Sequence, residues 1–285
     1  MRLRVKILLF LSCLLIFANF FVWKEVLGYK EQLEVVFFAI GQGDSIFIET
    51  PQKHQILIDG GPSRELILEK LAQEMPFWDR TIDLVVLTHP DVDHRKGIES
   101  VLDRYKVGQI LLTAVGQEKL KELGRTEIGQ NNQGVGQVIG HLGTEIKAGR
   151  TELFVLSPKE GEIGQDTNDS SLVIRLDFLN NSFLFTGDIS SKIEKEILNS
   201  GQVLKADVLK VAHHGSKTSS SPDFLAQVNP SLAIISCGKN NPYNHPHPEV
   251  LRTLDNFAIK VLRTDLQGDI EIVSKGNNLT ISYKQ

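Results

Sequence analysis

The sequence Leu-Thr-His-Pro-Asp-Val-Asp-His-Arg-Lys-Gly, residues 87–97, decides the fold of this chain. It follows an apolar run that predicts a buried strand, and a helical pattern comes after it. Within it, His89, Asp91, Asp93 and His94 bring together two imidazoles and two carboxylates, which are metal-ligand side chains. Singly, an aspartate here would be a helix N-cap and a histidine would be structural. All four at the end of one strand favour a metal site.

Two later motifs also place metal-ligand side chains at strand ends. In Phe-Thr-Gly-Asp-Ile, residues 185–189, a glycine lets the backbone turn, so that the Asp188 carboxylate could bridge two cations. The alternative role of Asp188 is a helix N-cap. In Lys-Val-Ala-His-His-Gly-Ser, residues 210–216, one of His213 and His214 can bind a metal. Together with the first motif, the histidine pair favours a shared site over a structural role.

The composition is that of a globular protein of 285 residues, which is long enough for one sizeable domain. The formal net charge is −4 and the pI is about 6.1. These values argue against affinity from a broad basic surface, but they allow a local nucleic-acid groove. Cys13 and Cys237 are the two cysteines, and we expect no disulfide framework from them.

The N-terminal segment, residues 1–24, predicts a single-pass membrane anchor. Three basic residues precede an almost continuous apolar run, residues 7–23, whose helix would span about 25 Å. The positive-inside rule then places the N-terminus in the cytoplasm and the rest of the chain outside it. A cleaved signal peptide followed by secretion is the alternative, although the large Phe20 makes a poor cleavage site.

The remaining chain is interpreted as a linker, residues 25–32, and one hydrolase-like domain, residues 33–285. Strands and helices alternate in two successive sets, separated by a Gly-, Gln- and Asn-rich stretch, residues 124–143, that predicts a loop. Asn180-Asn181 predicts a hairpin turn in the second set. Two such sets predict two sheets packed together with helices outside them.

The order of these motifs resembles the metallo-β-lactamase fold superfamily, and more closely the hydrolase domain of ComEC-type DNA-uptake (competence) proteins. The matching pieces are His89-x-Asp91-x-Asp93-His94, Thr186-Gly187-Asp188, His213-His214-Gly215-Ser216, Gly41–Ser45, Asp59–Gly61, Asn168–Val173 and His245–Pro248. The resemblance covers roughly residues 34–273. It implies a four-layer αββα sandwich, with metals held at one end between the two sheets.

The chain departs from the usual superfamily pattern at two places. Asp91 stands where a histidine is usual, and Asn168 or Ser171 falls where a further histidine ligand is expected. These departures argue against an antibiotic-hydrolysing lactamase or a glyoxalase-type thioesterase. They agree with the ComEC-like branch.

We therefore predict a site for two divalent metal ions. His89 and Asp91 are assigned to one ion, Asp93 and His94 to the other, and Asp188 to both. His213 is preferred over His214 as the remaining ligand, although the sequence does not separate the two. Three carboxylates favour Mn²⁺ without excluding Zn²⁺.

Two such ions can lower the pKa of a bound water and neutralise charge on a phosphodiester, which predicts hydrolysis. Asp93 or Asp188 could accept the water's proton, Lys210 could contact a phosphate oxygen, and His214 would lie near the substrate. The predicted substrate contacts are Asn168, Ser171, Ser216, His245 and His247.

The leading hypothesis is a membrane-anchored, outward-facing, metal-dependent nuclease or phosphodiesterase that acts on DNA. The first alternative is a hydrolase for another phosphoester, such as a cell-wall polymer or a phosphorylcholine-type ester, which suits the acidic pI. The second is a binding or scaffolding protein in which metal only stabilises the fold. With one predicted span, a role in DNA uptake would require partner membrane channel proteins.

Overall fold

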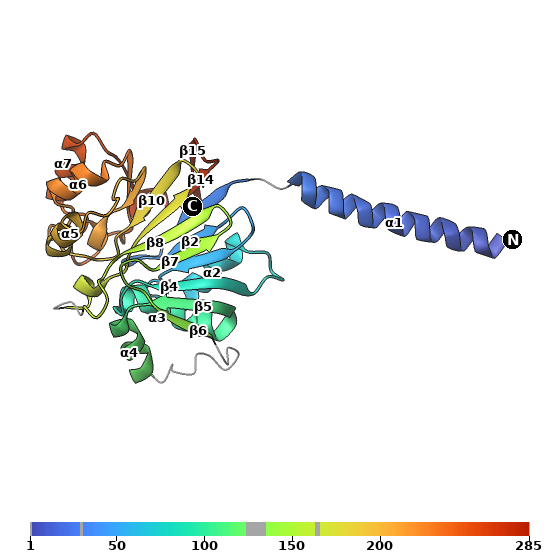
Figure 1. Cartoon of the computed structure of the whole chain (residues 1–285), viewed down its shortest axis with the longest axis horizontal. Helices are drawn as coiled ribbons and strands as arrows, with labels where there is room; N and C mark the ends of the chain where they lie inside the picture. Colours follow the sequence, from blue (N-terminus) through green and yellow to red (C-terminus); the bar gives the residue numbers. More distant parts are fainter. Residues whose placement is uncertain (1, 29–30, 124–134, 163–165, 285) are drawn as a thin grey trace. The chain divides into compact units, whose positions relative to one another are not determined.

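The computed structural model describes residues 2–28, 31–123, 135–162 and 166–284. It divides into two units, Met1–Gln32 and Leu33–Gln285. The first unit contains helix α1 (Arg2–Gly28), labelled in Figure 1. Among the described residues, no helix combines the length and the apolar character needed to cross a bilayer. The predicted transmembrane helix is therefore not supported by the described part, and the side chains of residues 18 and 21–24 lie outside it.

Over its described residues, the second unit is built around two mixed sheets (Figure 1). The first sheet runs in the order β15 (Leu279–Lys284), β14 (Asp269–Ser274), β1 (Leu33–Phe37), β2 (Ile46–Glu49), β3 (Gln55–Ile58), β4 (Thr81–Leu87), β5 (Lys106–Leu112) and β6 (Gly136–Ile139). The second runs β13 (Lys260–Arg263), β12 (Leu232–Ile235), β11 (Val208–Lys210), β10 (Asn181–Phe185), β9 (Val173–Phe178), β8 (Thr151–Ser157) and β7 (Glu145–Ala148).

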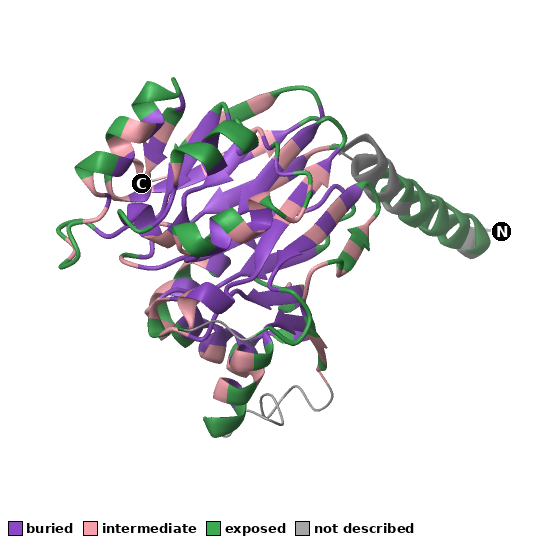
Figure 2. Ribbon diagram, turned by 60° about the vertical axis from the view of Figure 1, so that its left-hand side comes forward, coloured by how far each residue is buried: buried purple, intermediate pink, exposed green. Residues whose placement is uncertain are grey.

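Helices cover the outer face of each sheet. The described helices of this unit are α2 (Arg64–Glu74), α3 (Val92–Arg104), α4 (Ala114–Glu122), α5 (Ser191–Leu198), α6 (Pro222–Val228), α7 (Pro248–Asn256) and α8 (Thr264–Gln267), with 3-10 turns η1 (Asn168–Ser170) and η2 (Ala212–Gly215). Figure 2 shows the strands buried and the helices exposed on their outer sides. The predicted α/β fold with two packed sheets is confirmed.

Alternation of side chains along the strands creates the layers. In β1, Val35 and Phe37 enter a cluster between the two sheets, whereas Val36 enters a cluster beneath α2 and α3. In β10, Phe185 faces the other sheet and Leu184 packs toward α5 and α6. These two strands therefore bury residues on both faces, as expected for the central strands of an αββα sandwich.

Parallel strands bring the polar motifs to one edge of the sandwich. β3 and β4 are parallel in the first sheet, and β10, β11 and β12 are parallel in the second. The residues after their carboxyl ends include Asp59, His89, Asp188 and His214. This edge is where ligands bind in many open α/β sheets.

The predicted loop over residues 124–143 is wrong in its second half. Residues 136–139 form the edge strand β6, parallel to β5, and Val138 packs against the cluster between the sheets. The glycines and glutamine around it hid this short strand from pattern reading. Residues 124–134 of the predicted loop lie outside the described residues. The predicted hairpin at Asn180-Asn181 is confirmed by antiparallel pairing of β9 with β10.

Two glycines let α3 approach the loop after β3. The amide of Gly60 donates to the carbonyl of His94 at 2.7 Å, and the amide of Gly97 donates to that of Gly61 at 3.0 Å. A Cβ atom at position 97 would clash with the backbone of Gly60, and one at position 60 would clash with the backbone of α3. The start of α3, which carries Asp93 and His94, is therefore fixed by backbone contact.

We predict that Gly97→Ala lowers the free energy of unfolding by about 1–3 kcal/mol, because neither backbone can move freely. The matched control is Gly116→Ala in α4, where the added Cβ would lie 3.4 Å from the nearest atom, the Thr113 hydroxyl oxygen. That control should lose no stability, since alanine favours a helix over glycine. Urea unfolding of both variants checks this, and equal stability would contradict it.

Candidate metal centre

The buried carboxylate of Asp59 organises the first part of the site. Its oxygens accept hydrogen bonds from the Thr88 amide at 2.8 Å and from the Thr88 hydroxyl at 2.6 Å. Because that hydroxyl donates to Asp59, it can only accept from Nδ1 of His89, which lies 3.0 Å away. His89 thus carries its proton on Nδ1 and leaves Nε2 free to bind a metal.

Two further histidines have the same orientation. Nδ1 of His94 lies 2.7 Å from Oδ2 of Asp59, and Nδ1 of His214 lies 2.9 Å from the carbonyl oxygen of Ser236. Both partners are acceptors, so both Nδ1 atoms must donate. Nε2 is therefore the free nitrogen of each ring, as expected when an outer partner orients a metal ligand.

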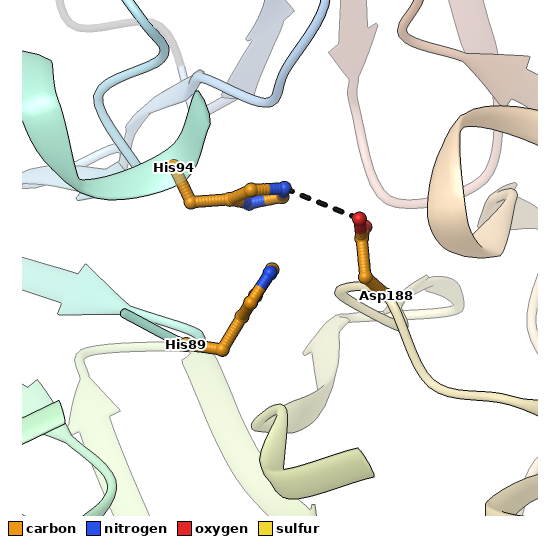
Figure 3. Close-up of side chains that lie close together, drawn as sticks. All are labelled: His89, His94 and Asp188. Carbon is orange, nitrogen blue, oxygen red and sulfur yellow. Dashed lines mark ion pairs between the residues drawn. The ribbon is translucent and has the colours of Figure 1, made fainter. Parts of the chain in front are cut away.

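The three Nε2 atoms face a common space beside Asp188. They are buried, and no hydrogen-bond partner is found for them among the described residues. Oδ2 of Asp188 lies 3.4 Å from Nε2 of His94 and 3.2 Å from Nε2 of His214. Figure 3 shows His89, His94 and Asp188 converging from three separate segments.

Four overlapping groups of potential metal ligands occur in the described part of the chain, each with ligand atoms within 4.8 Å of one another. They are His89/His94/Asp188, Asp93/His94/His214, Asp44/Asp188/His214 and Asp44/Asp59/His94. Unpartnered imidazole nitrogens next to carboxylates fit a divalent metal ion. The residues thus agree with metal binding, which the sequence predicted.

Opposite charges hold the cluster together. Burial alone would lower the pKa of His94 and His214, but nearby carboxylates, above all that of Asp188, raise both well above the usual value. Burial would likewise raise the pKa of Asp188, but the same two histidines hold it well below the usual range. His89 differs, because burial and the charge of His94 lower its pKa to about 3.

Two carboxylates of the site, Asp44 and Asp59, are missing from the predicted site residues. Asp59 contacts His94 as described, and Oδ1 of Asp44 lies 3.5 Å from Nδ1 of His214. Both lie in segments that matched the resembled subfamily, in Gly-Asp-Ser and Asp-Gly-Gly. The available signal was an aspartate beside glycine at a strand end, which is also common in ordinary turns.

Asp91, a predicted metal ligand, lies outside the four groups. It is the N-cap residue of α3, and its Oδ1 accepts a hydrogen bond from the Thr167 hydroxyl at 2.6 Å. Its side chain lines a surface groove of about 560 Å³ beside the cluster. The neighbouring Asp93 does join the cluster, with Oδ2 3.5 Å from Nε2 of His214.

The structure brings His214 into the cluster and leaves His213 outside it, contrary to the preference from sequence. Both residues have left-handed backbone conformations, with φ of 51° and 55°. The two rings therefore point in different directions, with ring planes 76° apart. His214 is buried among the carboxylates, whereas the ring of His213 neighbours that of His245 and has a pKa lowered by partial burial.

The other predicted site residues are those expected to contact the substrate or its phosphate. Ser171 is buried and its hydroxyl accepts from the amide of Asp188 at 3.2 Å, so it supports a ligand. Asn168 begins η1, and Ser216 is buried against Thr218. Lys210 is 1% exposed and pairs with Asp44, so its ammonium does not face solvent as a phosphate contact would. His245 and His247 lie near His213 in a row of rings.

Comparison with known proteins agrees with this fold and site. The family model described as the metallo-beta-lactamase superfamily matches residues 39–239. This chain belongs to that superfamily. The predicted resemblance is thereby confirmed.

The relatives found include competence and recombination proteins. The chain is 35% identical to "ComE operon protein 3" of Bacillus subtilis over 87% of the chain and 34% of that protein. It is 31% identical to "Recombination protein 2" of Haemophilus influenzae over 85% of the chain and 29% of that protein, and 30% identical to "Competence protein ComA" of Neisseria gonorrhoeae over 90% and 34%. The chain thus spans about a third of these relatives.

Solved structures share the fold at low sequence identity. YhfI from Bacillus subtilis, a metallo-beta-lactamase fold protein, has a TM-score of 0.57 and 14% identity over 89% of this chain and all of that chain. Zinc-bound PqqB from Methylobacterium extorquens has a TM-score of 0.54 and 13% identity over 78% and 85%. These likenesses establish the architecture.

We predict that metal affinity rises with pH and that binding releases protons. In the metal-free protein the raised pKa values keep His94 and His214 protonated at neutral pH, and a metal requires their neutral forms. Affinity should therefore increase as the pH approaches those values from below. Titration calorimetry with Zn²⁺ between about pH 6 and pH 8, in buffers of different protonation enthalpy, measures both quantities. An affinity independent of pH would contradict this.

Proposed function

We propose that this chain is a metal-dependent phosphodiesterase that acts on DNA. The observation that carries the proposal is the donor set, in which carboxylates accompany three imidazole nitrogens at one point. A set that mixes carboxylates with imidazoles can hold Mn²⁺ or Zn²⁺, and such cations bind anionic substrates. The relatives named for competence and recombination support DNA as the substrate.

The residues would take the following roles. His89, His94, His214, Asp93 and Asp188 would hold the divalent ions, Mn²⁺ or Zn²⁺. A divalent ion bound there supplies a Lewis acid for the phosphoryl oxygen and lowers the pKa of a bound water. Asp93, whose side chain is partly exposed at the mouth of the cluster, would accept the proton of the attacking water. With a metal bound, His94 and His214 would be neutral and would donate from Nδ1 to Asp59 and to the Ser236 carbonyl oxygen.

The charge around the site indicates where a polyanionic substrate could bind. The groove beside Asp93 is lined by acidic Asp91, Asp93, Glu118 and Glu122, with Arg95 and Lys119. Net negative charge there would repel a DNA backbone. A row of rings formed by His213, Tyr243, His245 and His247 does not line this groove and adjoins His214 through His213, and we place the substrate there.

The row of rings is joined to the site by a backbone hydrogen bond. Tyr243 stacks on His245 at 5.7 Å between ring centroids, and His247 lies 5.3 Å from His245. The amide of His247 donates to the carbonyl of Gly215, which follows the metal ligand His214. Flat rings hold the bases of single-stranded nucleic acids by stacking.

Hydrolysis of another phosphoester is the second candidate. The net charge of −4 and the acidic groove suit a smaller or less charged substrate, such as a cell-wall polymer or a phosphorylcholine-type ester. Membrane anchoring by residues 1–24, an extracytoplasmic location and association with a membrane channel stay predictions.

We predict that His89→Ala and Asp188→Asn each lower the rate of DNA hydrolysis by at least about a hundredfold, because each removes a metal ligand. The assay uses the purified full chain with Mn²⁺ or Zn²⁺, on single-stranded DNA, double-stranded DNA and bis(p-nitrophenyl) phosphate. His54→Ala is the matched control, since His54 precedes β3, at the opposite end of that strand from Asp59.

The pattern over the three substrates decides between the candidates. Activity on bis(p-nitrophenyl) phosphate without activity on either DNA would favour the second phosphoester. Activity that survives both substitutions would exclude the proposed site. Metal binding without turnover of any substrate would favour the binding-protein alternative.

We predict that Tyr243→Ala raises KM for a single-stranded oligonucleotide about tenfold, because one base loses its stacking partner. Hydrolysis of bis(p-nitrophenyl) phosphate should change less than about twofold, since the ring is 60% exposed and outside the metal cluster. Phe257→Ala, at the far end of α7, is the control aromatic substitution. Equal effects on both substrates would exclude a base-stacking role.

A further inference from the structure

Lys210 is a buried lysine at the end of β11, with a side chain 1% exposed. Its ammonium group contacts the carboxylate of Asp44, donates to the carbonyl oxygen of Gly187 at 3.1 Å, and lies 3.5 Å from Oδ1 of Asp188. An ammonium group has three donors. The Asp44 carboxylate and the Gly187 carbonyl oxygen are its close acceptors, and Oδ1 of Asp188 lies at ion-pair distance without a hydrogen bond. The ammonium group is therefore buried among protein partners and does not face solvent, where a substrate phosphate would approach.

The two carboxylate oxygens of Asp188 have different neighbours. Oδ1 faces the ammonium group, whereas Oδ2 faces Nε2 of His94 and Nε2 of His214. The sequence prediction assigned the Asp188 carboxylate to both of two cations. In the structure only Oδ2 is directed at the imidazole nitrogens.

Asp44 explains how a lysine can lie beside a metal centre. Its side chain is 2% exposed and comes from the loop between β1 and β2, in the sheet opposite Lys210. A buried ammonium ion needs an opposite charge, because its transfer from water is costly. Asp44 supplies that charge, and the contact of Lys210 with Asp188 involves Oδ1.

We infer that Lys210, held by Asp44, is a positioning residue that fixes Oδ1 of Asp188 and thereby presents Oδ2 to the metal. The inference rests on the metal centre proposed above. The ion pair of Lys210 with Asp44 would thus determine metal affinity, whereas the sequence predicted that Lys210 contacts the substrate.

Electrostatics and positioning predict opposite effects of removing the ammonium group. Loss of one positive charge beside the cluster should strengthen the binding of a cation if charge alone matters. Loss of the group that orients Asp188 should weaken it, as loss of an outer partner of a metal ligand usually does. The sign of the change therefore identifies the role.

The test measures binding of Co²⁺ to the full chain by competition with a chelator, together with the visible absorption of bound Co²⁺. We expect Lys210→Met to weaken binding about tenfold or more and to change the absorption spectrum. The double variant Lys210→Met/Asp44→Asn removes both charges and avoids an unpaired buried carboxylate, so it should fold. It should remain weakened, because Asp188 still lacks its partner. Because Asp44 also belongs to two of the candidate ligand groups, the size of the loss is read from Lys210→Met.

Lys70→Met is the matched control. Lys70 forms a largely buried ion pair with Asp269, at 2.8 Å, in the same domain. Its loss should lower the thermal stability and leave the affinity for Co²⁺ within about twofold of the wild type. A general loss of stability would act in all these variants alike.

The outcomes separate this inference from the proposed metal centre. If the wild type binds no Co²⁺, both are wrong. If the wild type binds Co²⁺ and either Lys210→Met or the double variant binds it as tightly or more tightly, the positioning role alone is wrong. Weakened binding in both, with an unchanged Lys70→Met control, supports it.

Discussion

The carboxylate of Asp59 is the contact on which the site depends. It lies at the end of β3 and accepts from the amide and hydroxyl of Thr88, which follows β4, and from His94 in α3. Through Thr88 it also sets the tautomer of His89. One buried acceptor thus joins two strand ends to a helix and leaves two imidazole nitrogens free. Burial of this carboxylate raises its pKa, and its three donors offset the cost of burial.

A second set of contacts ties the two sheets together at the same edge. Asp44 belongs to the first sheet's loops, whereas Lys210, Asp188 and His214 lie at or after strand ends of the second. The ion pair of Lys210 with Asp44 connects the two sheets. The hydrophobic cluster between the sheets brings these strands together, and the buried charges then make contact at the edge. The geometry of the site therefore depends on how the two sheets pack against each other.

Much of the site could be predicted from residues that are neighbours in sequence. His89, Asp93 and His94 belong to one short motif, and Asp188 follows a recognisable strand and glycine. Asp91 and His213 show where such prediction stops. Asp91 and His213 each have a neighbour of the same residue type, so the sequence does not distinguish them from Asp93 and His214. Asp91 is the N-cap of a helix and contacts Thr167. The left-handed backbone of His213 and His214 directs the ring of His213 away from the cluster. Backbone angles of single residues decide these directions, and pattern and spacing do not specify them.

The sequence by itself determined the class of this protein, because strand-end motifs with metal-ligand side chains recur in a fixed order and alternate with apolar strands. It also determined the two-sheet architecture, since two sets of strands and helices must bury their apolar faces against each other. Only the tertiary structure decided that His214 joins the cluster, that Asp44 and Asp59 support it, and that Lys210 is buried. These facts depend on side chains from strands and loops that are distant in sequence, and folding alone brings them within hydrogen-bonding distance.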